Sequence, residues 1–230
     1  MVTTILIEDQ IEIPPIRDLD EFRRWATSDE FPPSGRIDFV AGRIEVDMSP
    51  EELHSHGKLK VELVRALANR IFEQPMGEVY SDRTRVSCPD ADLSAEPDIV
   101  FVSDEAIDSG RVRLVPQPGG EPDRYVELEG PPDLIVEIVS DSWQHKDTER
   151  LPKAYWRAGV REYWLVDARG RDMAFRISRW GDRRYEPAPA DSESYQYSAA
   201  LGLWCKLDRA RNSRGRLHYT LLTKEPPSNL

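Results

Sequence analysis

The chain has 230 residues, of which 42 are acidic and 31 basic, and its formal net charge is −11. A chain of this length fits one domain with a sizeable core, and its acidic balance argues against non-specific nucleic-acid binding through overall charge. No apolar run reaches the length of a membrane span. Two cysteines without metal-ligand spacing, Cys88 and Cys205, predict reduced thiols and a cytoplasmic protein.

The first part of the chain predicts an arm, a short helix, a hairpin and a long helix. Residues 1–19 are rich in isoleucine and form an N-terminal arm, which we expect to lie at a sheet edge or to pair with a second copy in a homodimer. A short helix is expected over 18–27, and the segments 36–40 and 43–48 flank a glycine turn. Proline in the sequence 49–52 then marks the start of the longest helix.

The remainder predicts mainly strands. Apolar, β-branched runs alternate with segments rich in glycine, proline and charge. The expected strands cover 78–86, 97–102, 125–128, 132–140 and 161–166, a helix covers 147–158, and β-hairpins follow over 172–222. This order predicts an α/β (α+β) fold with helices on the faces of a mixed β-sheet and extra C-terminal hairpins. Basic residues cluster at 169–184 and 206–216, and charge runs of this kind are usually solvated faces. The alternative is that the arginine-rich hairpins after residue 169 flank a substrate groove.

Two carboxylates belong to strands that otherwise look buried. Asp98 is the second residue of the run 97–102, and Glu137 lies inside the run 135–139. A buried carboxylate is costly unless it is paired or bound to a cation. If the two strands bring them together, Asp98 and Glu137 form an oxygen-ligand site for a divalent metal. For Asp98, the structural alternative is an ion pair with Arg83 or Arg85.

Several segments together are similar to those of one known family. They are the hairpin 40–50, the helix that carries His56, the strands at 97–98 and 132–140, and the most specific run, YWRAGVREYWLVD at 155–167. Over roughly residues 20–205 the chain resembles the Uma-two family of PD-(D/E)XK nucleases. The resemblance implies a single restriction-endonuclease-like domain over 20–230. It also implies an endonuclease that hydrolyses phosphodiester bonds in DNA with Mg²⁺ or Mn²⁺.

The resemblance assigns the metal to Asp98 and Glu137, with Glu45 as a further acidic ligand. His56 lies where the family commonly has a histidine. The structural alternatives are an exposed hairpin residue for Glu45 and a satisfied polar group for His56.

The lysine that the superfamily places two residues after the glutamate is absent, because position 139 is Val139. A basic residue from the following helix would replace it, and Lys146 and Lys153 are the candidates, although exposed helix lysines are usually solvated. The missing lysine and the acidic composition favour a second hypothesis, a non-catalytic nuclease-fold module for binding or assembly.

Overall fold

The computed structural model describes residues 12–141 and 146–227, without the side chains of 146 and 147. Most of the predicted N-terminal arm, residues 1–11, therefore lies outside the described residues. The helices are α1 (Leu19–Ala26), α2 (Leu59–Glu73), α3 (Asp104–Asp108) and α4 (Leu151–Ala158), with short helical turns η1 (Leu53–Lys58), η2 (Pro89–Ala91) and η3 (Lys146–Arg150).

The strands form three sheets. The first sheet has β1 (Arg36–Val40), β2 (Arg43–Asp47), β4 (Arg85–Cys88), β5 (Leu93–Ala95), β7 (Arg113–Pro116) and β8 (Tyr125–Glu129). The second has β3 (Gly77–Ser81), β6 (Ile99–Ser103), β9 (Leu134–Ile138), β10 (Glu162–Asp167), β11 (Ala174–Trp180) and β12 (Tyr185–Pro187). The third has β13 (Gln196–Ser198), β14 (Leu203–Arg211) and β15 (Leu217–Lys224).

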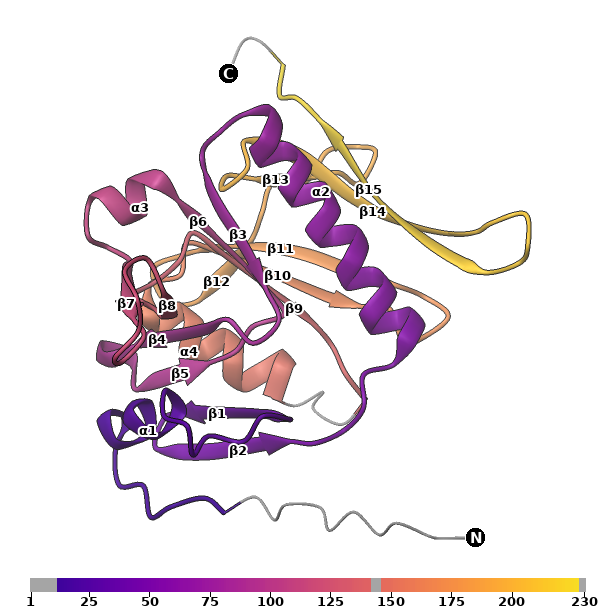
Figure 1. The fold of residues 1–230 in the computed structure, drawn as a ribbon. Coiled ribbons are helices and arrows are strands. Elements are labelled where there is room, and N and C mark those ends of the chain that lie inside the picture. The colour runs from indigo at the N-terminus through magenta and orange to yellow at the C-terminus, as the bar shows by residue number, and fades with distance from the viewer. Residues whose placement is uncertain (1–11, 142–145, 228–230) are drawn as a thin grey trace, which may run out of the picture.

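The central layer is a mixed sheet in the order β12-β11-β10-β9-β6-β3 (Figure 1). Strands β9 and β10 run parallel and are connected through α4, whereas β6 is antiparallel to β9. A parallel pair requires a crossover connection, which α4 supplies. The predicted mixed sheet with helices on its faces and additional C-terminal hairpins is confirmed.

One face of the central sheet is covered by α2 and by the β13-β14-β15 sheet. The helix buries Leu59, Leu63 and Leu67, spaced four residues apart so that they share one face. They join a core with Val136 of β9 and Trp164 of β10. This burial anchors α2, and with it the turn η1 that precedes it.

The opposite face packs against α4 and the β2-β1-β5-β4-β8-β7 sheet. Tyr155 of α4 lies in this second core with Ile135 of β9 and Val86 of β4. Because side chains alternate along a strand, Glu137 points to the same side as Ile135, into the space between the sheets. The sequence did not reveal that this space is closed by a second sheet rather than by helices alone.

The long helix begins later than expected. Residues 49–52 are irregular, and a π-helical turn starts at Leu53 before α2. The carboxylate of Glu52 caps this turn by accepting hydrogen bonds from the backbone N–H groups of His54 and Ser55. The N-terminal N–H groups need such an acceptor, so Glu52, and not the preceding proline, marks the start.

The expected strand 78–86 is two strands in different sheets. Asp82 and Arg83 have φ values of 35° and 60°, in the left-handed region that interrupts a strand. The chain therefore leaves the central sheet after β3 and enters the other sheet as β4. This turn places Asp82 at the edge of the site described below.

Local signals elsewhere agree with the structure. Asp18 caps α1, and Gly159 ends α4 with a φ of 85°. Cys88 and Cys205 are both buried free thiols. Within the described part of the chain, no helix has the length and apolar character needed to span a membrane.

Candidate functional site

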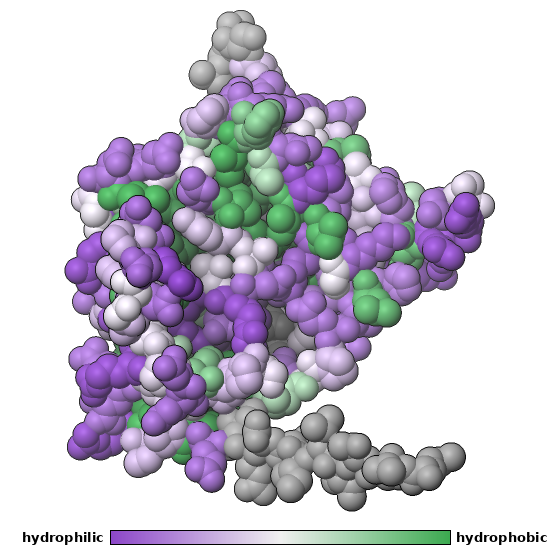
Figure 2. Space-filling model, in the orientation of Figure 1, coloured by the Kyte–Doolittle hydropathy of each residue, from purple (hydrophilic) through white to green (hydrophobic). Residues whose placement is uncertain are grey.

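A cavity of about 710 Å³ opens where the two larger sheets meet the start of α2. Figure 2 shows hydrophilic residues around the hollow on this face, below the more hydrophobic surface of α2. Charged side chains dominate the lining: Arg36, Asp47, Glu51, Glu52, His56, Lys60, Asp82, Arg83, Glu96, Asp98, Asp141 and Arg169. A cavity so rich in carboxylates and cations is suited to ionic ligands.

Asp98 lies at the centre of this site because of strand register. It directly precedes β6, in which Ile99 is opposite Val136 of β9. Extending this antiparallel register by one residue puts Asp98 opposite Glu137, on the same face of the sheet. The backbone N–H of Ile138 donates a hydrogen bond of 2.7 Å to Asp98 Oδ2, which fixes the carboxylate and leaves Oδ1 toward the cavity.

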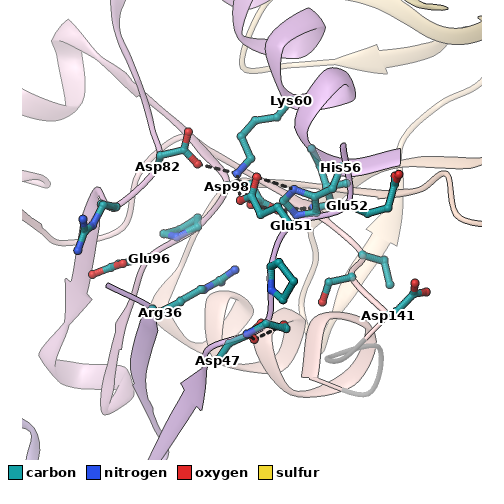
Figure 3. Close-up of a pocket in the computed structure, with 18 of the residues that line it drawn as sticks. Arg36, Asp47, Glu51, Glu52, His56, Lys60, Asp82, Glu96, Asp98 and Asp141 are labelled. Atoms are coloured by element: carbon teal, nitrogen blue, oxygen red, sulfur yellow. Dashed lines mark hydrogen bonds and ion pairs between the residues drawn. The ribbon is translucent and has the colours of Figure 1, made fainter. Parts of the chain in front are cut away.

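His56 and Lys60 approach Asp98 from the helical segment above it (Figure 3). They are one helical turn apart, so both project from the same face. Nε2 of His56 lies 3.4 Å and Nζ of Lys60 lies 3.2 Å from Asp98 Oδ1. Lys60 Nζ also contacts Glu51 and Asp82, each at 2.6 Å. Three carboxylates therefore surround one ammonium group.

These contacts set the protonation states. Burial raises the pKa of Asp98, but the hydrogen bond from His56 and the charges of His56, Lys60 and Arg36 outweigh it and hold this pKa below its usual range. Burial lowers the pKa of Lys60, but the negative charges around it raise this pKa well above its usual value. The Asp98 carboxylate is therefore ionised and Lys60 remains a cation near neutral pH.

Glu51, His56 and Asp98 form a group that can hold a metal ion. One ligand atom from each lies within 4.8 Å of the others. His56 Nδ1 is buried and has no hydrogen-bond partner among the described residues, with Glu51 Oε2 3.5 Å away. One imidazole nitrogen together with two carboxylates is a chemically suitable donor set for Mn²⁺, while the carboxylates alone suit Mg²⁺.

Glu137 is held differently. It is fully buried and does not line the cavity. Its carboxylate accepts hydrogen bonds from Arg36 Nη2, at 3.1 and 3.3 Å, and from the hydroxyl of Tyr155 at 2.7 Å. Arg36 also pairs with Asp38 at 3.0 Å and lines the cavity. The Arg36 guanidinium therefore neutralises the Glu137 carboxylate, for which the sequence predicts a metal ion shared with Asp98.

The other predicted residues are more distant from this group. Glu45 is buried but does not line the cavity, and Arg150 Nη1 lies 2.6 Å from its carboxylate. Lys153 is exposed on α4 and also does not line the cavity. The side chain of Lys146 lies outside the described residues. Of the six residues predicted from the sequence, Asp98 and His56 are in direct contact in this cavity.

The structural alternative for Asp98 does not hold within the described chain. Arg85 pairs with Glu96, and Arg83 donates to the carbonyl of Pro33 at 2.6 Å, so neither arginine pairs with Asp98. Its partners are instead His56 and Lys60.

Sequence reasoning missed three residues of the site: Lys60, Glu51 and Arg36. A signal for Lys60 was present, because a basic residue four positions after His56 in a helix lies on the same face. No local signal points to Arg36, which comes from β1 and meets a residue about a hundred positions later.

The mixed central sheet, with one buried carboxylate inside β9 and another directly before the neighbouring β6, defines a restriction-endonuclease-like fold. The Uma2 family model, described as "Putative restriction endonuclease", matches residues 19–209. The chain belongs to this family, as the resemblance predicted.

Other comparisons support the fold. A crystal structure of a "putative nuclease belonging to DUF820" from Anabaena variabilis superposes with a TM-score of 0.59 and 18% identity. The match covers 81% of this chain and 91% of that one. No curated protein matches the chain.

Proposed function

We propose that this protein is a metal-dependent endonuclease that hydrolyses phosphodiester bonds in DNA at the cavity around Asp98. The observation that carries the proposal is a fixed, ionised carboxylate that shares one cavity with an ammonium group and a candidate metal-binding group. Membership of a family described as "Putative restriction endonuclease" supports this reaction class. The fold likeness to a crystal structure titled "putative nuclease" agrees with this assignment.

Asp98, Glu51 and His56 are the residues that would hold the metal. A bound Mg²⁺ or Mn²⁺ supplies charge neutralisation of the phosphate and a water of lowered pKa. Because a histidine is in the donor set, Mn²⁺ suits these three residues better than Mg²⁺. Glu137 and Glu45 remain predicted ligands, and Glu137 can join only if Arg36 releases it, because both of its oxygens contact that guanidinium.

We assign to Lys60 the role for which the sequence offered Lys146 and Lys153. Its ammonium group stays protonated, since three carboxylates surround it. It therefore stabilises negative charge on an attacked phosphate and does not act as a general base. Val139 itself is buried and lines the cavity, but its side chain is apolar and supplies no positive charge there.

The test compares two isosteric substitutions. In Asp98→Asn the amide oxygen still accepts from the Ile138 N–H, so the fold is preserved while the charge is lost. The control is Asp133→Asn, because Asp133 is equally buried, at 5% exposure, and accepts from Ser103 N at the other end of β9. We expect wild type and Asp133→Asn to nick supercoiled DNA in Mn²⁺ or Mg²⁺, and Asp98→Asn to lose at least 100-fold in rate, a loss of roughly the size typical of charge-stabilising groups.

Equal cleavage by the two variants would refute the proposed site. The alternative hypothesis, a non-catalytic module for binding or assembly, predicts no cleavage by any form and no stabilisation by metal. The predicted homodimer is tested separately, by the mass of the protein in solution.

A further inference from the structure

We propose that an arginine-lined groove next to the candidate site binds the sugar–phosphate backbone of DNA and leads the strand to Asp98. The inference rests on the proposed function and adds the surface that holds the substrate. The groove has a volume of about 570 Å³ and is lined by Arg169, Arg171, Arg209 and Arg211. Four arginines face only two carboxylates there, although the whole chain carries a net charge of −11.

The groove is continuous with the cavity around Asp98. Both are lined by Glu52, Ser55, Asp141 and Arg169. The arginines come from the β10–β11 connection and from the β14–β15 hairpin. Figure 1 shows this hairpin extending beyond the rest of the fold on the side where α2 begins. A polyanion lying along the hairpin would therefore enter the cavity without leaving the surface.

The side-chain pattern of β14 changes where the groove begins. Leu203, Cys205 and Leu207 are buried against the core. The next two positions on the same face are Arg209 and Arg211, because side chains alternate along a strand. Two arginines on the inward face of β14 are not needed to complete the core. The change from apolar side chains to arginines is explained if this part of the face binds an anionic ligand.

Arg209 is held in a fixed position without losing its charge. Its guanidinium donates to the carbonyls of Ala168 at 2.9 Å and Gly170 at 3.0 Å, and also to that of Arg171. Carbonyl groups accept hydrogen bonds but carry no formal charge, so the positive charge is not neutralised. These bonds also join the hairpin to the β10–β11 connection, so both sides of the groove keep their relative position.

Two further arginines offer free charge. Arg171 and Arg211 are exposed and form no ion pair with any residue that the structure describes. Arg169 differs, because it pairs with Asp167 at 2.8 Å and with Asp141 at 3.4 Å. Guanidinium groups bind phosphate through two parallel hydrogen bonds, so Arg171 and Arg211 are the expected phosphate contacts.

The experiment measures binding of a labelled DNA duplex by fluorescence anisotropy in EDTA over a range of salt concentrations. The test variant is the double substitution Arg171→Ser with Arg211→Ser. The control is Arg24→Ser with Arg183→Ser, which removes the same charge from two exposed residues that line neither cavity. Thermal unfolding establishes that all forms are folded, and cleavage of the duplex in Mn²⁺ is measured in parallel.

Each phosphate contact contributes about 0.9 to the slope of log K against log salt, so the test variant should lose about 2 from that slope. If the difference vanishes near 1 M salt, this predicts roughly 60-fold weaker binding near 0.1 M. The control should bind as the wild type does. If the test variant instead binds like the control while the wild type cleaves DNA, the groove is refuted and the proposed function stands. If the wild type neither binds nor cleaves, both fail together.

Discussion

Removal of Glu137 should destabilise the fold as well as the site, because its carboxylate is the main partner of Arg36. Loss of one member of a buried ion pair costs about 3–5 kcal/mol. Arg36 is 23% exposed and keeps its pair with Asp38, which reduces the expected cost to roughly 2–3 kcal/mol. The hydroxyl of Tyr155 also loses its acceptor, at about 1 kcal/mol.

Glu137→Ala should therefore lower the free energy of unfolding by about 3–4 kcal/mol. With a urea m-value of about 3 kcal/mol/M, the midpoint falls by roughly 1 M. Urea unfolding followed by fluorescence measures this shift. Glu137→Gln keeps an acceptor for Tyr155, so its loss should be smaller by about 1 kcal/mol. The control Glu186→Ala breaks only an exposed pair with Arg179 and should cost less than about 1 kcal/mol.

A loss below about 1 kcal/mol in Glu137→Ala would show that Arg36 does not depend on Glu137, and would refute this reasoning. A double-mutant cycle with Arg36→Met isolates the coupling between the two side chains. The result also decides how cleavage assays are interpreted, because an inactive Glu137→Ala protein is informative only if it is folded under the assay conditions.

Three further outcomes are expected. Burial lowers the pKa of His56, but Asp98 raises this pKa more, so without metal the pair stabilises the fold fully below pH about 6.5 and loses this contribution as the pH rises through the higher folded pKa. The difference in Tm between wild type and His56→Gln should therefore shrink from acidic to alkaline pH. A constant difference would contradict this expectation. Mn²⁺ at about 100 times its Kd should raise the Tm of the wild type by roughly 5–10 °C and leave that of Asp98→Asn nearly unchanged, whereas equal shifts would place the metal elsewhere. Glu162 accepts four hydrogen bonds, from an indole, a hydroxyl and two backbone N–H groups. Because Glu162→Gln turns an amide NH₂ toward these donors, it should lower the free energy of unfolding, measured with a chemical denaturant, by roughly 1–3 kcal/mol. An unchanged free energy of unfolding would show that this network does not require a carboxylate.

The sequence predicted the features that depend on neighbouring residues. Periodicity, caps and glycine turns identified α1, the β1–β2 hairpin and the end of α4, because these signals act within a few positions. The two acidic residues in apolar runs also stood out locally, because a buried carboxylate needs a partner. The run at 155–167 identified the family, and the family model confirmed it.

Only the tertiary structure decided which partners those carboxylates have. Strand register places Asp98 and Glu137 opposite one another, but Arg36 from the neighbouring sheet neutralises Glu137, while Lys60 and His56 meet Asp98. These contacts join residues far apart in the chain, and their geometry depends on how the sheets and α2 pack, which local patterns do not encode. The sequence alone therefore determined that a charged site exists near these strands, and the packing determined which side chains form it.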